Sequence, residues 1–439
     1  MAHTRDIIDF VEFFQEILPK SLIMEKSKEL GCLKRQRKLD FHAFVWATLF
    51  SFATGHSRTL ANALRQYRKL TPSQNHVNQS AFWKRFTPAF VTFLKVLFGI
   101  VQDRAISRKK EAGNSGLLSR FEAVDIQDST VLTLRNFLET KYPGVKSRAG
   151  LKLHTVMTAE ETGPYRVRVS CGRTADCKEL TVDEKMRGRL LLIDMGYASY
   201  KLLEKIHRVG GFFITPAKSN ADLRIKRRSG HAEEPYQSWQ DLKVSEFISN
   251  HEGQDFDFEV EVVIRRRKYN SRCNKARKRF RCVCIWNAEK KRHNVYLTNV
   301  PVDTLTTLEV QSVYRARWLV ELLFCELKKH LKLGDQPSRS EYVMKALIWS
   351  TLILLLISKK LGQVVRKKLG KDGFKVRPMR WTIVFACYAV DLLNLLFRPG
   401  ELCHWDKKQL SAAILHEAID PNIGRLSLTD QVNAGLGYP

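Results

Sequence analysis

The sequence predicts a mixed α/β fold with helical regions at both ends, mainly from the period of its apolar residues. Apolar residues recur at helical spacing in residues 6–14, 43–50 and 90–98, and again after Leu308. Between residues 123 and 299 apolar and polar residues alternate instead, as they do in half-buried strands. A chain of 439 residues with 44% hydrophobic residues can bury a sizeable core in about two or three structural units.

Residues 1–118 are predicted to be helical and basic. With 74 Lys+Arg against 45 Asp+Glu, the chain carries a net charge of +29, which favours nucleic acid over a membrane surface as partner. Basic side chains usually form solvated helix faces, but here they could equally form a DNA-binding surface. The alternative is a soluble basic protein without such a partner. The basic residues of this region include Lys34, Arg35, Arg37, Lys38, Arg65, Arg68, Lys69, Lys84 and Arg85.

Residues 119–219 are predicted to form the first part of an α/β core, after a polar linker at 108–116. Three alternating strands come first, then an apolar strand typical of one buried on both faces. We therefore expect three strands in a meander, followed by crossover connections. The expected elements are strands at 123–128, 150–157, 166–171, 190–194 and 211–215, with a helix at 198–209.

Residues 220–303 show a β pattern and are predicted to form an antiparallel β insertion. Its strands are expected at 256–264, 280–286 and 294–299, and ten Lys/Arg between Arg265 and Arg281 predict a positively charged hairpin. Helical spacing returns in residues 304–375, the second part of the core, and in the C-terminal region 376–439.

Cysteines and apolar runs indicate a soluble, intracellular protein. The nine cysteines are scattered without a C-x-x-C pair, which fits reduced thiols better than a zinc site. The N-terminus lacks a signal-peptide pattern, and the longest uncharged apolar run, residues 346–358, is shorter than the ~20 residues that span a bilayer. We expect a buried core helix there, no membrane partner and a cytoplasmic location.

Two aspartates are predicted at strand ends, where open α/β sheets bind ligands. Asp128 ends the first strand and Asp194 ends the buried fourth strand, so their carboxylates converge if the two strands are neighbours. Taken singly, either residue is more often a turn residue or a helix N-cap.

A third carboxylate lies in a helical motif further along the chain. Tyr314, Arg317, Glu321 and Lys328 project within an arc of about 60° on an α-helix. Glu321 alone could simply pair with Arg317 in an ordinary helix salt bridge, and Lys328 could be a solvated residue. Together with Asp128 and Asp194, Glu321 provides hard oxygen ligands for two Mg²⁺ or Mn²⁺ ions, while the cations face phosphates.

The motif Y-x2-R-x3-E-x6-K resembles the signature of insertion-sequence transposases of the insertion-sequence-four type. Tyr314, Arg317, Glu321 and Lys328 match it, and the segments around Asp128 and Asp194 look like the family's first two Asp motifs. The resemblance implies a ribonuclease H-like core with an Asp-Asp-Glu triad, interrupted by a β insertion. It implies catalytic and metal-binding roles for Asp128, Asp194 and Glu321, and DNA contacts from the other three residues.

The family's activity is cut-and-paste transposition, with nicking, hairpin formation, hairpin opening and strand transfer at one site. The resemblance implies double-stranded DNA partners (terminal inverted repeats and target DNA), a homodimer in the DNA complex and a nucleoid-associated location. Residues 376–439 could help to pair two subunits or pack on their own core. Trp286 and Tyr296 are open candidates for stacking on a flipped base, and His154 is expected to be structural or to lie behind the site.

Two alternatives remain at this point. A stand-alone metal-dependent nuclease of the same fold is the first, although the insertion and the signature helix count against plain hydrolysis. A catalytically inactive DNA-binding relative is the second, and the intact set of Asp128, Asp194 and Glu321 counts against it.

Overall fold

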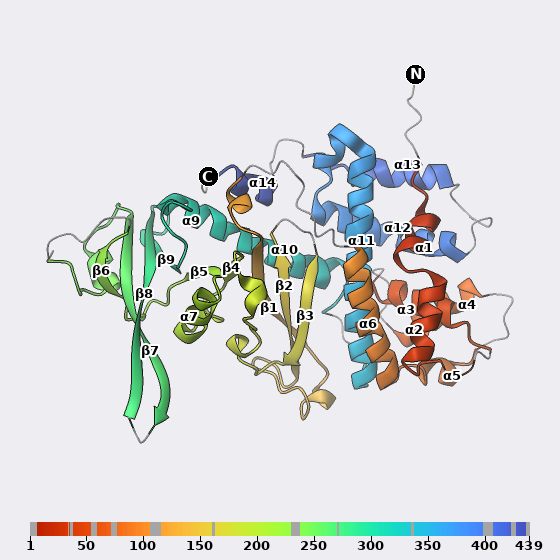
Figure 1. The fold of residues 1–439 in the computed structure, drawn as a ribbon. Helices are drawn as coiled ribbons and strands as arrows, with labels where there is room; N and C mark the ends of the chain where they lie inside the picture. Colours follow the sequence, from red (N-terminus) through yellow and green to blue (C-terminus); the bar gives the residue numbers. More distant parts are fainter. Residues whose placement is uncertain are drawn as a thin grey trace.

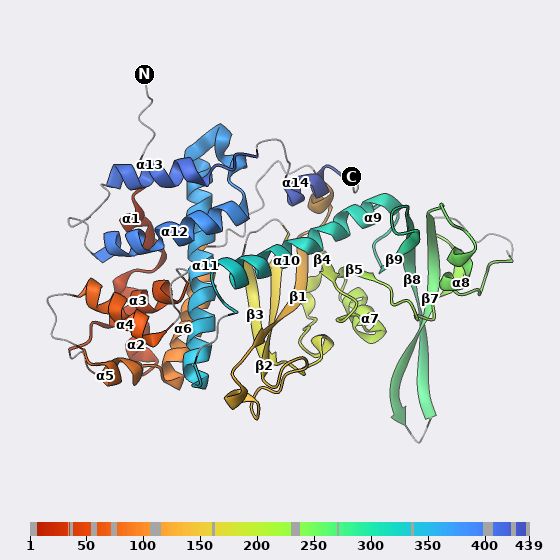
Figure 2. The ribbon, with the colours of Figure 1, turned by 180° about the vertical axis from the view of Figure 1, so that it is seen from behind.

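The computed structural model contains a helical bundle and a nine-stranded sheet, side by side and crossed by one long helical segment (Figures 1 and 2). It describes residues 7–33, 35, 38–53, 59–71, 77–105, 116–159, 163–229, 238–269, 272–334, 338–397, 407–422 and 427–435. Most of the predicted linker at 108–116, and the predicted basic residues Lys34 and Arg37, lie outside these ranges.

Helices from both ends of the chain build the bundle. α11 packs against α3 and α6, and α12 packs against α1 and α3. The N-terminal and C-terminal helices, assigned to different regions from the sequence, therefore share one core (Figure 1). The helices are α1 (Phe10–Ile17), α2 (Lys20–Glu29), α3 (Phe41–Ala53), α4 (Leu60–Leu70), α5 (Gln79–Trp83), α6 (Pro88–Ala105), α11 (Glu341–Leu369), α12 (Pro378–Phe397) and α13 (Lys407–Ala418).

Aromatic side chains fill the interior of the bundle. Phe14 packs edge-on against Trp46 with ring centroids 5.5 Å apart, and Phe44 packs against Phe82 at 5.0 Å. Such pairs contribute about 0.5–1.5 kcal/mol each beyond the burial of their area. Asp9 caps α1 by accepting hydrogen bonds from two backbone N–H groups of its first turn.

Two helical stretches, Glu341–Lys375 and Pro378–Phe397, are long and apolar enough to cross a membrane by length and composition. In the first, 83% of the apolar window is buried inside the protein, and in the second 50%. The buried surface of α11 includes Lys359, whose ammonium forms an ion pair with Glu326. Packing within the bundle accounts for the apolar character of α11.

The first five strands form a ribonuclease H-like sheet, which confirms the predicted fold class. β1 (Val124–Thr133), β2 (Gly150–Thr158) and β3 (Pro164–Cys171) form an antiparallel meander. β4 (Leu190–Ile193) lies parallel to β1, and β5 (Phe212–Pro216) lies parallel to β4. The crossover between β4 and β5 contains α7 (Tyr200–Arg208).

The β insertion continues this sheet, because β9 pairs antiparallel with β5. Its elements are β6 (Arg224–Arg228), α8 (Val244–Ser249), β7 (Phe256–Tyr269), β8 (Arg272–Asn287) and β9 (Arg292–Thr298). The strand order is β3-β2-β1-β4-β5-β9-β8-β7-β6.

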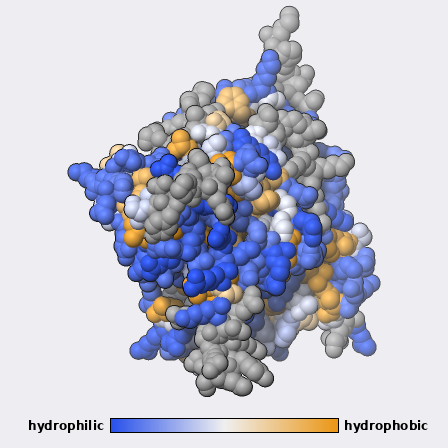
Figure 3. Space-filling model, turned by 60° about the vertical axis from the view of Figure 1, so that its left-hand side comes forward, coloured by the Kyte–Doolittle hydropathy of each residue, from blue (hydrophilic) through white to orange (hydrophobic). Residues whose placement is uncertain are grey.

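β6 and α8 were not predicted from the sequence. The basic segment of β6 forms a strand because β7 supplies opposite charges across the ladder. Arg227 binds Glu259 at 2.6 Å, and Lys226 lies 3.7 Å from Glu261. The surface at this end of the molecule is mostly hydrophilic (Figure 3).

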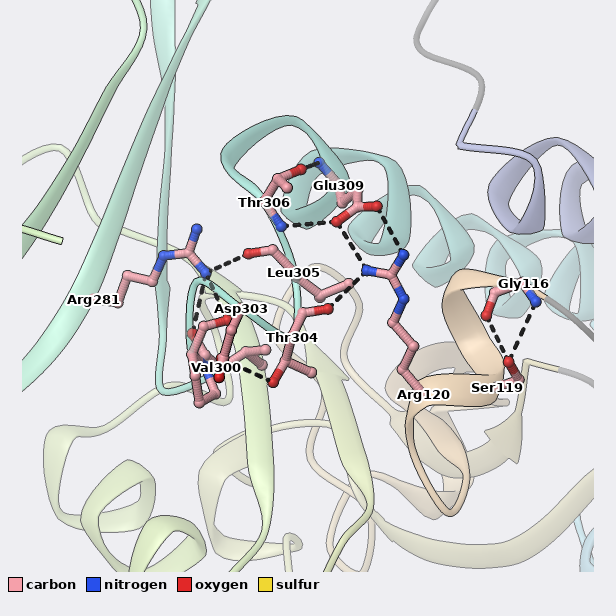
Figure 4. A network of polar contacts seen from close by, with 11 residues as sticks. Gly116, Ser119, Arg120, Arg281, Val300, Asp303, Thr304, Leu305, Thr306 and Glu309 are labelled. Carbon is pink, nitrogen blue, oxygen red and sulfur yellow. Dashed lines mark hydrogen bonds and ion pairs between the residues drawn. The ribbon is translucent and has the colours of Figure 1, made fainter. Parts of the chain in front are cut away.

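The crossing segment consists of α9 (Thr307–Tyr314), a 3₁₀ turn (Arg315–Arg317), α10 (Trp318–Cys325) and a π-helical turn (Glu326–His330). Its start is held from two sides. Thr306 and Glu309 form a capping box, and Arg120 donates to both carboxylate oxygens of Glu309 (Figure 4). Arg281 of β8 donates to the carbonyl of Leu305, and these contacts orient the segment relative to the sheet.

Candidate active site

Asp128 on β1 and Asp194, the residue directly after β4, occupy equivalent positions relative to two neighbouring parallel strands. The last residue pair between β1 and β4 is Gln127 with Ile193, and each aspartate is the next residue. Alternation along both strands directs the two side chains to the face that α10 crosses. Convergence of the two carboxylates requires that β1 and β4 be neighbours in the sheet, and the structure shows that they are.

Asp128 does not end its strand, so that detail of the prediction is wrong. β1 continues to Thr133 because β2 remains paired with it, from Asp128 opposite Thr155 to Thr133 opposite Gly150. Only the pairing with the shorter β4 stops before Asp128. The Asp128 carboxylate therefore lies where β1 pairs with β2 alone, just beyond the end of β4.

The crossing segment brings Arg317 and Glu321 to Asp128. Arg317 Nη1 lies 2.8 Å from Asp128 Oδ2 and 3.4 Å from Glu321 Oε1. The ordinary i, i+4 salt bridge considered from the sequence is thus present, but the shorter contact goes to the sheet. One guanidinium joins two of the three predicted carboxylates.

The segment from Tyr314 to Lys328 is not one regular α-helix, as the 100° projection assumed. Tyr314 ends α9, Arg317 lies in the 3₁₀ turn, Glu321 in α10 and Lys328 in the π-helical turn. The Tyr314 hydroxyl donates to the carbonyl of Ile193 at 3.3 Å, one residue before Asp194. π-helical turns are frequent at functional sites, and this one carries the last residue of the motif.

Burial dominates the electrostatics of Asp128. It raises the pKa of this carboxyl to about 6; the Ser129 N–H and Arg317 act in the opposite direction, while Glu321 and Asp194 raise the pKa further. Burial also lowers the pKa of Lys328, and Glu321 counteracts this shift. The three predicted carboxylates and both predicted cations therefore share one electrostatic environment.

Aromatic rings border this environment on one side. Tyr296 of β9 and Tyr314 have ring centroids 5.1 Å apart, and the guanidinium of Arg317 lies 6.0 Å from the ring centroid of Tyr314. Burial raises the pKa of Tyr314, which keeps its hydroxyl protonated. Trp286 packs instead against His293, near the turn between β8 and β9. Of the two stacking candidates, Tyr296 is the one beside the site.

The oxygen ligands of the site suit a hard cation, but their arrangement is not yet that of a metal centre. Within the described part of the chain, no three His, Cys, Asp or Glu residues are grouped closely enough to hold a metal ion. Arg317 pairs with both Asp128 and Glu321 instead. The donors fit Mg²⁺ or Mn²⁺ in kind, provided that Arg317 gives up its contacts with them.

A set of polar residues lies on the reverse face of the sheet, behind Asp128, and its member Asp176 was not predicted from the sequence. Asp176 hydrogen-bonds to Ser129, the neighbour of Asp128. His154, expected to be structural or to lie behind the site, is buried and faces Tyr197. Asp176 belongs to a short 3₁₀ turn between β3 and β4, and neither a strand end nor a spacing in the sequence marks it.

Comparison with known proteins identifies the family of this region. Residues 120–357 match the family model described as "Transposase DDE domain". The chain is 22% identical over 399 residues to the transposase for insertion sequence element IS231F of Bacillus thuringiensis subsp. israelensis, covering 83% of this chain and 82% of that protein. It is 24% identical over 369 residues to the transposase for element IS1151 of Clostridium perfringens, covering 76% of each chain.

A solved structure, the piggyBac transposase synaptic complex with hairpin DNA, aligns with 96% of this chain and 88% of its own. The TM-score is 0.47 at 12% sequence identity.

Proposed function

Since the chain belongs to the family of transposases with a DDE domain, we propose that it moves an insertion sequence by cutting and rejoining double-stranded DNA. Asp128, Asp194 and Glu321 are the proposed catalytic residues. The observation that carries this assignment is the single guanidinium of Arg317, within 3.4 Å of carboxylates from β1 and from α10. Side chains 189 residues apart in sequence meet there, on the sheet face that also carries Asp194.

The proposed cofactor is Mg²⁺ or Mn²⁺, two ions per site, held by the same three carboxylates. The chemistry that the bound ions supply is activation of an attacking oxygen and stabilisation of the leaving oxygen. Ligand carboxylates must be ionised, whereas burial raises the pKa of Asp128 to about 6 without metal. The charge of Arg317 partly compensates that of Asp128 in the absence of metal.

Arg317, Lys328 and Tyr314 are the proposed contacts with the DNA backbone. Arg317 donates through Nη1 alone to described residues, so its other N–H groups can bind a phosphate. Lys328 forms no ion pair within 4 Å with a described carboxylate, which leaves its ammonium available. The Tyr314 hydroxyl holds the segment against Ile193 and so supports the positions of both cations.

The proposed sequence of reactions is nicking, hairpin formation, hairpin opening and strand transfer. Each is a phosphoryl transfer that needs an activated oxygen and a stabilised leaving group, so one carboxylate site suffices for all four. The role of Arg317 and Lys328 is to hold the backbone between steps, and Tyr296 is placed to meet a displaced base beside Tyr314.

DNA binding outside the site is proposed for the basic N-terminal region, residues 1–118, and for the insertion, residues 220–303. Lys275, Arg277 and Arg279 are exposed on β8 and point to a backbone-binding role. The proposed catalytic core consists of residues 119–219 and 304–375, and its last helix, α11, also packs in the helical bundle. A homodimer with one site per element end, associated with the nucleoid in the cytoplasm, completes the proposal. Residues 376–439 contribute to pairing only through surface that the bundle leaves free.

The test uses a supercoiled plasmid that carries the DNA flanking the gene on both sides. Wild type with Mg²⁺ is expected to give nicked, hairpin-ended and strand-transfer products, and Asp128→Asn is expected to give none. Asp222→Asn is the control, since this exposed carboxylate pairs with Arg224 on β6, in the insertion rather than at the site. Nicks without hairpins or joined strands would identify a plain nuclease. Binding without cleavage would identify an inactive relative.

A further inference from the structure

The reverse face of the sheet, opposite α10, carries a polar network directly behind the candidate site. Its members come from β1, β2, β3 and the two loops that flank β4. Ser129 and Lys152 point to this face because they alternate with Asp128 and with the core residues Leu151 and Leu153. The network consists of Ser129, Lys152, His154, Ser170, Asp176 and Tyr197.

Asp176 lies at the centre of this network. Its Oδ1 accepts a hydrogen bond from the Ser129 hydroxyl at 2.8 Å and lies 3.1 Å from Lys152 Nζ. Lys152 also donates to the carbonyl of Thr174 at 2.9 Å, so it holds the short turn of Asp176 against β2. The ion pair offsets the charge of Asp176, which would otherwise repel the neighbouring carboxylates.

Ser129 connects Asp176 to Asp128 through two different groups. Its backbone N–H donates to Asp128 Oδ1 at 2.7 Å, while its hydroxyl donates to Asp176. A change in the position of Ser129 therefore changes the direction of the N–H that orients the Asp128 carboxylate. The Ser129 N–H contacts Oδ1 of Asp128, whereas Arg317 contacts Oδ2, so the two donors act on different oxygens of the carboxylate.

A second arm of the network reaches the loop of Asp194. The Tyr197 hydroxyl lies 3.2 Å from His154 Nδ1, and His154 Nε2 lies 2.8 Å from the Ser170 hydroxyl. Tyr197 also donates its backbone N–H to the carbonyl of Asp194. Between the two arms, a Cβ at Gly196 would stand 3.6 Å from Asp176 Oδ2 and 3.9 Å from Asp194 Oδ2.

We propose that Asp176 is a positioning residue of the transposase site, which acts through Ser129 on Asp128 and backs the loop of Asp194. The inference rests on the proposed function, because it concerns the orientation of two proposed metal-binding carboxylates. Groups that orient such carboxylates typically change metal affinity or activity by about 10- to 100-fold when removed. Asp176 does this without touching DNA or the reacting atoms.

The experiment measures Mn²⁺ binding by calorimetry and single-turnover cleavage of the plasmid carrying the gene's flanking DNA. Asp176→Ala and Ser129→Ala are each expected to weaken Mn²⁺ binding and to slow cleavage, by about tenfold. The double variant Asp176→Ala with Ser129→Ala is expected to lose no more Mn²⁺ affinity or cleavage rate than either single variant, since both changes remove the same hydrogen bond. Asp176→Asn keeps an acceptor for Ser129 and is expected to stay within about threefold of wild type.

Glu179→Ala is the matched control. Glu179 directly follows the turn of Asp176, its side chain is 23% exposed against 25% for Asp176, and its partner is Arg168 rather than Ser129. Both measurements should remain within about twofold of wild type. If Asp176→Ala folds poorly because Lys152 is left unpaired, the double change Asp176→Ala with Lys152→Met removes that charge and should show the same loss of Mn²⁺ affinity.

Two results would overturn the proposal. One is an Asp176→Ala variant whose Mn²⁺ affinity and cleavage rate per folded molecule equal those of the wild type. The other is an additive loss in the double variant, which would mean that Asp176 and Ser129 act independently. Failure of the proposed function looks different: wild type would not cleave, or Asp128→Asn would cleave as wild type does.

Discussion

Two buried arginine–aspartate pairs, Arg317 with Asp128 and Arg281 with Asp257, differ in how many of their donors are used. The side chains are similarly buried, at 15% and 14% exposure in the first pair and 7% and 14% in the second. Arg281 directs Nε and Nη2 to Asp257 and Nη1 to three backbone carbonyls, whereas Arg317 reaches described residues through Nη1 alone. We call Arg281 saturated, because all three of its guanidinium nitrogens donate hydrogen bonds to described residues, and Arg317 unsaturated, because only one does. A saturated guanidinium stabilises the fold, whereas an unsaturated one has N–H groups available to a ligand.

The largest effect is expected from removing the saturated pair. Arg281→Met leaves Asp257 buried without its cation and removes a donor from three carbonyls in the loop before α9, so the free energy of unfolding should fall by about 3–5 kcal/mol. Urea denaturation measures this. Arg279→Met, on the same strand and 56% exposed beside Glu259, should cost less than about 1 kcal/mol. Equal losses from Arg281→Met and Arg279→Met would show that the buried Arg281–Asp257 pair contributes no more to stability than an exposed pair on the same strand.

Removing the unsaturated arginine is expected to affect reaction more than folding. Arg317→Met should slow single-turnover plasmid cleavage by about 100-fold or more, because the cation facing the phosphate is lost. The free energy of unfolding should change by less than about 1.5 kcal/mol, since Asp128 can take up a proton in place of the ion pair. Lys329→Met, exposed on the same segment, is the control. An unfolding defect as large as that of Arg281→Met would contradict the comparison.

The pH dependence of stability provides a third test, in EDTA. Asp128 holds its proton up to about pH 6 in the folded state, whereas the unfolded chain releases it near 3.8. The folded state binds more protons within this window, so the free energy of unfolding should fall as pH rises from about 4 to 6. Relative to Asp128→Asn, wild type should lose about 2–3 kcal/mol across the window. The free energies of unfolding come from urea denaturation at each pH. A difference between wild type and Asp128→Asn that stays constant from about pH 4 to 6 would contradict the prediction.

The smallest effect is expected at Thr307, whose hydroxyl donates to Asp257 Oδ2 at 2.8 Å. Thr307→Val removes one of several donors to this carboxylate and should lower the free energy of unfolding by about 1 kcal/mol. The rate of plasmid cleavage should not change, because the saturated pair only anchors α9. A slower reaction with normal stability would show that α9 transmits its position to Arg317.

Local patterns were sufficient to predict much of the fold and the neighbourhood of the candidate site. Alternation predicted the meander of β1 to β3, and the apolar run predicted β4, whose place beside β1 only the structure shows. Spacing placed Arg317 and Glu321 together, and the structure joins them to Asp128. These features depend on the period of a strand or a helix, which the sequence displays directly.

Features that depend on distant partners could not be predicted. Lys359 ends the apolar run of α11 in sequence, yet it is buried because Glu326 meets it across the bundle. In the sequence, nothing distinguishes Asp176 from other loop aspartates, because its partners Ser129 and Lys152 lie on β1 and β2, far away in the chain. The π-helical turn at Glu326–His330 likewise coincides with packing against α11 and α12, for which no local pattern exists.

The pairing of β5 with β9 bears on how this fold tolerates shortening. Phe213 and Ile214 of β5 are buried, and β9 covers the strand's outer edge along the ladder. A truncated enzyme without the insertion would expose that edge, with unpaired backbone groups beside apolar side chains, to other molecules. We expect such a protein to form aggregates by strand addition, so a minimal version requires a substitute strand or a charged residue on β5.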